Sequence, residues 1–197
     1  MFQNLVRNVS KTVIENISSS KHKYTTNQLY FVCGPMGSGK TTYINTNLLQ
    51  NEDIKAYYSN IDDLISYFKK ETDDPRQLYQ LTRQVGIIVT DYFLENHISM
   101  VIEGTGINMD TIEYFERLKK NGYQINTIFM KTELNTCRHR VKLRNETASH
   151  KVLDEDIIKY YQILWDGDDG KTKMEKLISD ISDNVTYVDN YSITKLK

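Results

Sequence analysis

Cysteines are few in this sequence, and long apolar runs and a signal-peptide core are absent. Only two of its 197 residues are cysteines, Cys33 and Cys137, and they lie in separate segments without the spacing of a metal site. We expect both to be buried thiols, which suits a reducing compartment. No apolar run reaches the roughly 20 residues of a membrane-spanning helix, and the first residues carry no signal-peptide core. We therefore expect a cytoplasmic protein without a membrane segment.

Net charge is also close to zero. Lysine and arginine together number 25, aspartate and glutamate 26, and the formal net charge is -1 at pH 7. Without a global positive field, a long nucleic acid is a disfavoured partner, although a local basic groove is compatible with this composition. The length suits one compact domain, and we expect residues 1–197 to form it.

The first regular pattern is an apolar stripe at helical spacing in residues 2–17, within an expected helix and connection over 1–24. The stripe consists of Phe2, Leu5, Val6, Val9, Val13 and Ile17. Two interpretations stay open. Either the stripe docks this helix on its own domain, or it binds a partner protein.

Beyond this segment, short apolar runs rich in β-formers alternate with helical patterns. Strands are predicted at 29–33, 56–60, 98–104, 123–131 and 185–190. Helices are predicted at 40–50, 61–70, 73–97, 109–122, 133–146 and 153–165, and an insertion loop at 165–173. Such alternation predicts a parallel α/β sheet covered on both faces.

The strongest motif follows the first of these strands. The pattern G-x-x-x-x-G-K-[ST] is matched by Gly34, Pro35, Met36, Gly37, Ser38, Gly39, Lys40 and Thr41, with Thr42 next in the chain. The glycines let successive N–H groups turn toward a phosphate, and the dipole of the following helix adds to their attraction. Lys40 suits the β and γ phosphates, and the Thr41 hydroxyl suits Mg²⁺. The motif predicts a nucleoside triphosphate site and leaves the fate of the phosphate open.

Carboxylates follow the next two predicted strands. Asp62 and Asp63 come after the second strand, and Glu103 and Thr105 lie at the end of the third. Ligands of open parallel sheets lie beyond the carboxyl ends of the strands, so these side chains are candidates to bind an acceptor. An aspartate there suits a general base, and Glu103 suits either an acceptor hydroxyl or a water on Mg²⁺. Spacing alone equally fits helix-capping aspartates and a plain glutamate at a strand end.

A basic run lies in the predicted helix 133–146. Arg138, Arg140, Lys142 and Arg144 belong to it, and Arg140 and Arg144, four residues apart, share one helix face. Two guanidinium groups on a mobile segment would neutralise charge on a transferring phosphate. A solvated basic face is the alternative.

Taken in order, these motifs resemble the zeta toxin family and related small P-loop kinases. The counterparts of the family pattern are GPMGSGKTT, NID, EGT, RVKLRNETASHKV and VDNYS. In the lid region, 133–153, the family pattern aligns without a gap, at Arg140, Val141, Arg144, His150 and Val152. The resemblance runs from about Leu29 to Ser192, and the order and spacing of the motifs are its most specific part.

The resemblance implies a fold, cofactors and a partner. The fold is a P-loop NTPase α/β/α sandwich with a mostly parallel five-stranded sheet, strand order 2-3-1-4-5, and a helical lid. The cofactors are ATP and Mg²⁺, with Thr41 on the metal. Zeta toxins meet a small helical antitoxin through an apolar surface helix, and residues 2–17 are the comparable segment here.

The resemblance also implies residue roles. Asn60-Ile61-Asp62 fits the family pattern, so Asp62 rather than Asp63 is the expected base. The other implied assignments are Glu103 and Thr105 on the acceptor, Arg140 and Arg144 with Lys40 on the transferring phosphates, and Asp189 and Asn190 near the nucleotide base.

Three positions depart from the family pattern. The Gly-Gly pair of the lid is Ala148-Ser149, and the proline after H-x-V is Leu153. The arginine two residues after E-G-T is Ile107, so a contact to the acceptor is missing. Zeta toxins phosphorylate the amino sugar of UDP-N-acetylglucosamine, and Ile107 puts this acceptor in question while leaving phosphoryl transfer intact.

The expected function is ATP-dependent phosphoryl transfer to a hydroxyl of a small acceptor, a UDP-amino-sugar being one candidate. A kinase for a nucleotide or a polynucleotide 5′-hydroxyl is the closest alternative. A pseudo-kinase that binds nucleotide and acts through its amino-terminal helix is an alternative of another class. A GTPase switch is disfavoured, because neither Asn-Lys-x-Asp nor Asp-x-x-Gly occurs in the sequence.

Overall fold

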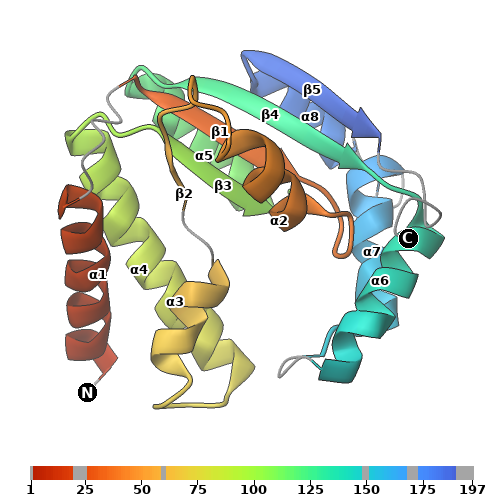
Figure 1. Cartoon of the computed structure of the whole chain (residues 1–197), viewed down its shortest axis with the longest axis horizontal. Helices are drawn as coiled ribbons and strands as arrows, with labels where there is room; N and C mark the ends of the chain where they lie inside the picture. Colours follow the sequence, from red (N-terminus) through yellow and green to blue (C-terminus); the bar gives the residue numbers. More distant parts are fainter. Residues whose placement is uncertain (1, 20–25, 59–60, 148–150, 168–172, 190–197) are drawn as a thin grey trace. The chain divides into compact units, whose positions relative to one another are not determined.

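The structure, a computed structural model, describes residues 2–19, 26–58, 61–147, 151–167 and 173–189. Its elements are labelled in Figure 1. They are α1 (Phe2–Ser19), β1 (Gln28–Cys33), α2 (Lys40–Tyr43), η1 (Ile44–Leu48), β2 (Tyr57–Tyr58), α3 (Ile61–Phe68), α4 (Pro75–Glu95), β3 (Met100–Gly104), α5 (Met109–Lys120), β4 (Gln124–Lys131), α6 (Leu134–Thr147), α7 (Asp154–Trp165), α8 (Met174–Ile181) and β5 (Asn184–Asp189). The strands form one sheet in the order β2-β3-β1-β4-β5, which confirms the order implied by the resemblance.

The chain divides into two compact units, each built from two stretches of sequence. The first unit combines Met1–Gln28 with Lys55–Ile102, and the second combines Leu29–Ile54 with Glu103–Lys197. The single domain expected over residues 1–197 stays a prediction. None of the helices given above has both the length and the apolar content that crossing a bilayer requires.

In the first unit, α1 packs along α4 (Figure 1). The apolar stripe of α1 is buried there: the exposed fraction is between 3% and 6% for Val6, Val9, Val13 and Ile17. Apolar burial of this extent stabilises the helix on its own chain. Of the two interpretations of the stripe, docking on its own chain accounts for this burial.

Strand β2 in the first unit is shorter than the predicted strand 56–60. Tyr57 and Tyr58 pair in parallel with Met100 and Val101 of β3, and residues 59–60 lie outside the described ranges. Helix α3 then begins at Ile61, as predicted, and carries Asp62 in its first turn.

In the second unit, β4 and β5 pair in parallel over six residues, from Asn126 opposite Asn184 to Lys131 opposite Asp189. Figure 1 shows α5 and α8 on one face of these strands and α2 on the other. Phe31 of β1 meets Phe115 of α5 edge to face, with ring centroids 5.1 Å apart. Helix α8 has no counterpart among the elements that the sequence predicted.

The helix predicted over residues 40–50 changes its character halfway. Lys40–Tyr43 is α-helical, and Ile44–Leu48 is a π-helix in which the Leu49 N–H donates to the Ile44 carbonyl at 2.9 Å. π-helical turns are rare and occur frequently at functional sites. This turn follows directly on the phosphate-loop helix.

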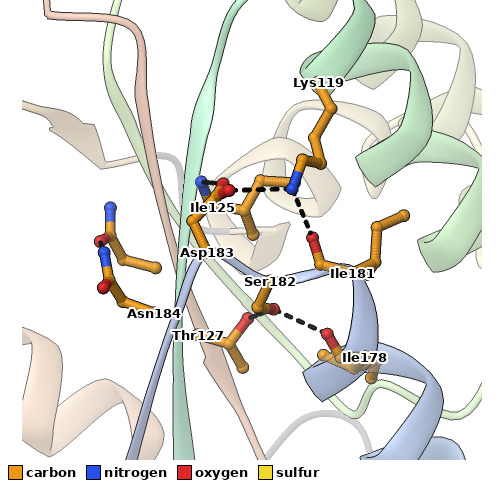
Figure 2. A network of polar contacts seen from close by, with 9 residues as sticks. Lys119, Ile125, Thr127, Ile178, Ile181, Ser182, Asp183 and Asn184 are labelled. Atoms are coloured by element: carbon orange, nitrogen blue, oxygen red, sulfur yellow. Dashed lines mark hydrogen bonds and ion pairs between the residues drawn. The ribbon is translucent and has the colours of Figure 1, made fainter.

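The start of β5 is fixed by a polar network around Asp183 (Figure 2). Its carboxylate accepts from the Ile125 N–H at 2.8 Å and from the Lys119 ammonium at 2.9 Å. The Asp183 N–H donates to the Ile125 carbonyl at 2.9 Å. These bonds, led by the one from the Ile125 N–H, lower the pKa of the Asp183 carboxyl. The network therefore sets the register of β5 on β4 and favours the ionised carboxylate.

We expect Asp183→Asn to destabilise the protein by about 1–2 kcal/mol at pH 7, because an amide offers one oxygen to two donors. A carboxyl with a depressed folded pKa stabilises the fold above its unfolded pKa, roughly 3.9, and loses this effect as the pH falls through the folded value. The difference between wild type and variant should therefore shrink toward pH 3. Urea unfolding at pH 7, 5 and 3 measures it.

The matched control is Asp180→Asn on α8. Asp180 lies 4.0 Å from Lys176, and both side chains are more than 60% exposed, so this change should cost almost nothing. An Asp183→Asn deficit that stays the same from pH 7 to pH 3 would contradict the role given to the carboxylate.

Candidate active site

The phosphate loop connects β1 to α2 through residues 34–39, and two glycines have φ in the left-handed region. Gly37 has φ 80° and Gly39 has φ 94°. A Cβ atom on Gly37 would lie 2.4 Å from the carbonyl oxygen of Cys137 in α6. Only glycine fits both this backbone conformation and this approach. The loop is therefore in direct backbone contact with α6.

Two side chains hold the loop in this position. The Thr132 hydroxyl donates to the Ser38 carbonyl at 3.0 Å, and the Arg140 guanidinium donates to the Gly37 carbonyl at 3.4 Å. Arg140 is one of the arginines expected at the phosphates, and it reaches the loop. Thr132 was missed by the sequence reasoning, although its place just beyond β4, at the carboxyl end of a strand, is a signal of the kind used for Glu103.

Apolar packing joins the same loop to α6 and α7. Cys137 and Val141 of α6 and Ile157 of α7 form a buried cluster, and Met36 of the loop packs against it. Both cysteines are free and buried, as expected. Burial raises the pKa of Cys33 to about 12 and that of Cys137 to about 11, so both thiols stay protonated near neutral pH.

Lys40 lies at the first residue of α2, with its ammonium turned back over the loop. Its Nζ donates to the carbonyl oxygens of Gly34 and Pro35, each at 3.0 Å. Burial lowers the pKa of the Lys40 ammonium, the Glu103 carboxylate opposes this shift, and the Arg144 charge adds to it. Lys40, Glu103 and Arg144 therefore interact electrostatically at the phosphate loop.

Thr41 and Glu103 form a pair beside this lysine. The Thr41 hydroxyl donates to a carboxylate oxygen of Glu103 at 2.9 Å. Glu103 lies on β3, one residue before its end. Hydroxyl and carboxylate oxygens are ligands that Mg²⁺ prefers, and kinases complete its shell with phosphate oxygens and water. The pair fits a magnesium ion shared with a triphosphate.

Thr105 follows Glu103 by two residues. Its carbonyl accepts a weak bond from the Cys33 thiol at 3.6 Å. A Cβ on Gly106, which has φ 68°, would lie 2.3 Å from the Cys33 sulfur. The backbone after β3 is therefore packed tightly on the end of β1, which puts Thr105 in the same unit as Lys40.

The predicted lid region, 133–153, contains α6 and the connection to α7, and described contacts brace it at two places. Arg138 donates twice to the Asp154 carboxylate, at 2.7 Å each. Asn145 bonds both the N–H of Val152, at 3.1 Å, and its carbonyl, at 2.8 Å. Residues 148–150, with the Ala148-Ser149 departure and His150, lie outside the described ranges. Sequence reasoning missed Asn145, which closes the base of this connection.

Three expected site residues are not brought to the loop by any described contact. Asp62 belongs to the first unit, and its side chain is outside the description. Asp189 ends β5 and is exposed, while Asn190 lies beyond the described ranges. The roles given to these three residues stay predictions.

A glycine loop between a strand and a helix, with its lysine and threonine beside an acidic strand end, defines a P-loop nucleotide-binding protein. The sheet order 2-3-1-4-5 is that of the kinase-like members of this class. A family model described as "Zeta toxin" matches residues 11–166, and the chain belongs to this family. Membership supports a kinase-type phosphotransferase that binds ATP.

Solved structures agree on the fold. The chain is similar to a structure of the PezAT toxin–antitoxin system of Streptococcus pneumoniae, with 16% identity, TM-score 0.63, and coverage of 94% of this chain and 76% of that one. It is also similar to a structure of AvrRxo1-ORF1:AvrRxo1-ORF2 with sulphate ions, with 13% identity, TM-score 0.64, and coverage of 93% and 63%. A third similarity is to the Pnkp1/Rnl/Hen1 RNA repair complex, with 17% identity, TM-score 0.58, and coverage of 79% and 49%. No curated protein matches the chain.

We expect Gly37→Ala to abolish ATP binding and to destabilise the protein. An alanine in the left-handed region costs about 1–2 kcal/mol, and the new methyl group also meets the Cys137 carbonyl. Urea unfolding and ATP titration by calorimetry measure the two effects.

Gly86→Ala is the control, because Gly86 lies within α4 and a Cβ there meets no atom within 4 Å. This variant should keep ATP binding and gain up to about 1 kcal/mol from helix propensity. Unchanged ATP affinity in Gly37→Ala would show that the close approach to α6 is not needed for the nucleotide site.

Proposed function

We propose that this protein transfers the γ-phosphate of ATP to a hydroxyl group of a small acceptor. The observation that carries the proposal is the Thr41–Glu103 hydrogen bond, 2.9 Å long, beside the buried ammonium of Lys40. It joins the phosphate loop to an acidic residue at the carboxyl end of β3, the edge at which sheets of this kind bind ligands. Thr41 and Glu103 would hold Mg²⁺ there, and the ion would supply positive charge that neutralises the charge developing on the phosphate.

The phosphate loop holds the triphosphate in this reaction. The phosphate loop Gly34–Thr42 binds the β-phosphate through backbone N–H groups at its helical end, while Lys40 exchanges its two carbonyl partners for phosphate oxygens. Both partners are neutral dipoles, so an anionic oxygen is the stronger acceptor. The lowered pKa of the Lys40 ammonium returns toward its ordinary value when this negative charge arrives.

Arg140 and Arg144 stabilise the transferring phosphoryl group from the lid. Arg140 already donates to the loop at Gly37, and the charge of Arg144 acts on Lys40. Guanidinium groups aimed at developing charge in a site shielded from water are among the largest contributors to such catalysis. The braces at Arg138–Asp154 and Asn145–Val152 limit the motion of these helices relative to each other.

The acceptor side consists of Asp62, Glu103 and Thr105. Asp62 takes the proton of the acceptor hydroxyl as the new P–O bond forms, and the bond between the γ-phosphorus and the bridging oxygen breaks to leave ADP. Glu103 and Thr105 orient the acceptor, and Asp189 and Asn190 bind near the base of ATP. A UDP-amino-sugar is the candidate acceptor suggested by the family. Because Ile107 stands where the family has an arginine, fewer protein groups are available to bind the charged part of the UDP-amino-sugar.

An antitoxin-like helical protein is the proposed partner. Two of the similar structures carry titles that pair two components, and one of these titles says toxin–antitoxin. Because the apolar stripe of α1 is buried, such a partner would meet the polar side of this helix, where Lys11 and Glu15 are exposed.

We expect Asp62→Asn to keep ATP affinity and to lose phosphoryl transfer by about 10²–10⁴-fold, the usual contribution of a general base. Asp63→Asn is the matched control, since it removes the same charge from the neighbouring residue and should retain activity. Transfer is measured by mass spectrometry with ATP, Mg²⁺ and a panel of UDP-sugars, nucleosides, nucleotides and 5′-hydroxyl oligonucleotides. Undiminished transfer by Asp62→Asn would remove Asp62 from the mechanism.

We expect Arg144→Ala to lower kcat about 10²–10³-fold, the magnitude for losing one donor to developing charge, with little change in ATP affinity. Lys142→Ala removes the same charge from an exposed position of the same helix and should leave kcat within twofold or so. Equal losses in the two variants would indicate a general effect of helix charge and would contradict a specific role of Arg144.

A further inference from the structure

An open pocket of about 420 Å³ lies in the second unit, apart from the phosphate loop. Most of its strand residues lie in the amino-terminal halves of β1, β4 and β5, including Tyr30, Asn126 and Asn184. The phosphate loop follows the carboxyl end of β1, so the pocket belongs to the opposite end of the strands. Its other wall is the end of α2, η1 and the turn beyond it, with Tyr43, Asn47 and Asn51. A volume of this size is in the range of small-molecule sites.

Most of the residues around this pocket are polar, three are aliphatic, and none is charged. None of the side chains that line it is charged, although 26% of the residues of the chain are. Four asparagines, two tyrosines and Thr186 supply hydrogen-bonding groups, while the hydroxyl of Thr127 bonds Ser182 on the other face of the strands. A site of this kind has no counter-charge for a phosphate or a carboxylate, and it favours a neutral ligand.

The hydrogen bonds within the pocket leave specific amide atoms available. Asn184 donates to the Asn126 oxygen at 2.9 Å, and Asn126 donates to the Leu29 carbonyl at 3.3 Å, which orients both amides. Figure 2 shows Asn184 on the far side of the strands from Thr127 and Ser182. With its nitrogen engaged, the Asn184 amide keeps its oxygen as an acceptor among the described contacts.

The helical wall adds a second acceptor and a donor. Asn47 uses its nitrogen on the Tyr43 carbonyl and the Thr46 hydroxyl, which leaves its oxygen. Asn51 uses its oxygen to accept from the Asp53 N–H at 3.0 Å, which leaves its nitrogen as a donor. The π-helical turn contributes to this arrangement, because one extra residue in a turn rotates all following side chains by about 100° around the helix axis.

We propose that this pocket is a second ligand site, which binds a neutral heterocycle of the nucleobase class, presented as a nucleoside without phosphate. Asparagine amides pair with the donor and acceptor pattern on the edge of a base. Tyr43 supplies an aromatic ring on which a planar heterocycle can stack. Because its lining carries no charge, this pocket favours a different ligand from the triphosphate expected at Lys40. The proposed site does not depend on phosphoryl transfer.

The test is titration of the full chain with adenosine, guanosine, cytidine and uridine in turn, followed through the side-chain amide signals of asparagine in ¹⁵N NMR. We expect saturable shifts for Asn47, Asn51 and Asn184 with at least one nucleoside. The same titration with Lys40→Ala should give the same dissociation constant, since Lys40 serves only the phosphate loop.

Two variants probe the pocket itself. Thr186→Lys places a charged chain in it and should weaken binding roughly tenfold or more, as should Asn47→Leu, which removes an acceptor. Gln124→Lys, an exposed position of β4 outside the pocket, adds the same charge and should bind as wild type does. The proposal is overturned if no nucleoside gives saturable shifts, if both pocket variants bind unchanged, or if Lys40→Ala abolishes the shifts.

Discussion

The close approach of the phosphate loop to α6 is the constraint on which the second unit depends. At Gly37 the loop backbone comes so near the Cys137 carbonyl that no side chain fits between them. Met36 packs on the cluster shared by α6 and α7, and Arg140 donates from α6 back to the loop. Because α6 also carries Arg144, the contact that shapes the loop also fixes the helix on which this arginine lies.

The electrostatics of the loop follow from burial. The Lys40 ammonium is removed from water and satisfied by two carbonyl oxygens, so its pKa is lowered, while Glu103 works in the opposite direction. A charged group of this kind gains much from an anionic ligand, because the cost of removing it from water is already included in the fold. Glu103 also accepts a hydrogen bond from the Thr41 hydroxyl. This bond positions the two oxygen ligands expected for Mg²⁺.

Much of the fold and part of the site could be predicted from the sequence. The phosphate loop has a fixed spacing, and α4 begins at Pro75 behind the capping residue Asp74, both local patterns. Strand order came from the family resemblance, since periodicity does not determine which strands are neighbours. Helix α8 was missed, although Met174 and Ile178, which are buried, have helical spacing.

The contacts that brace the site could not be predicted in this way. Thr132 bonds Ser38, which is distant in the sequence, and Asn145 bonds Val152 across a connection. The carboxyl end of β4 marks Thr132 as close to the site, but no local pattern predicts the partner of either residue. The π-helical turn also has no local sequence signal, because it depends on the packing of Ile44 and Leu48, which are both buried. The uncharged pocket behind this turn became visible only once the asparagines of β4, β5 and the helical wall were brought together.

The most direct measurement of the central claim is the fate of the γ-phosphate. ATP and Mg²⁺ are incubated with the protein and each acceptor of the panel, and the masses of all products are measured by mass spectrometry. The Lys40→Ala variant is the control. The account predicts one acceptor that gains a single phosphoryl group with stoichiometric ADP, and no product with Lys40→Ala. ATP that is never consumed, or whose phosphate goes only to water whatever acceptor is present, would contradict it.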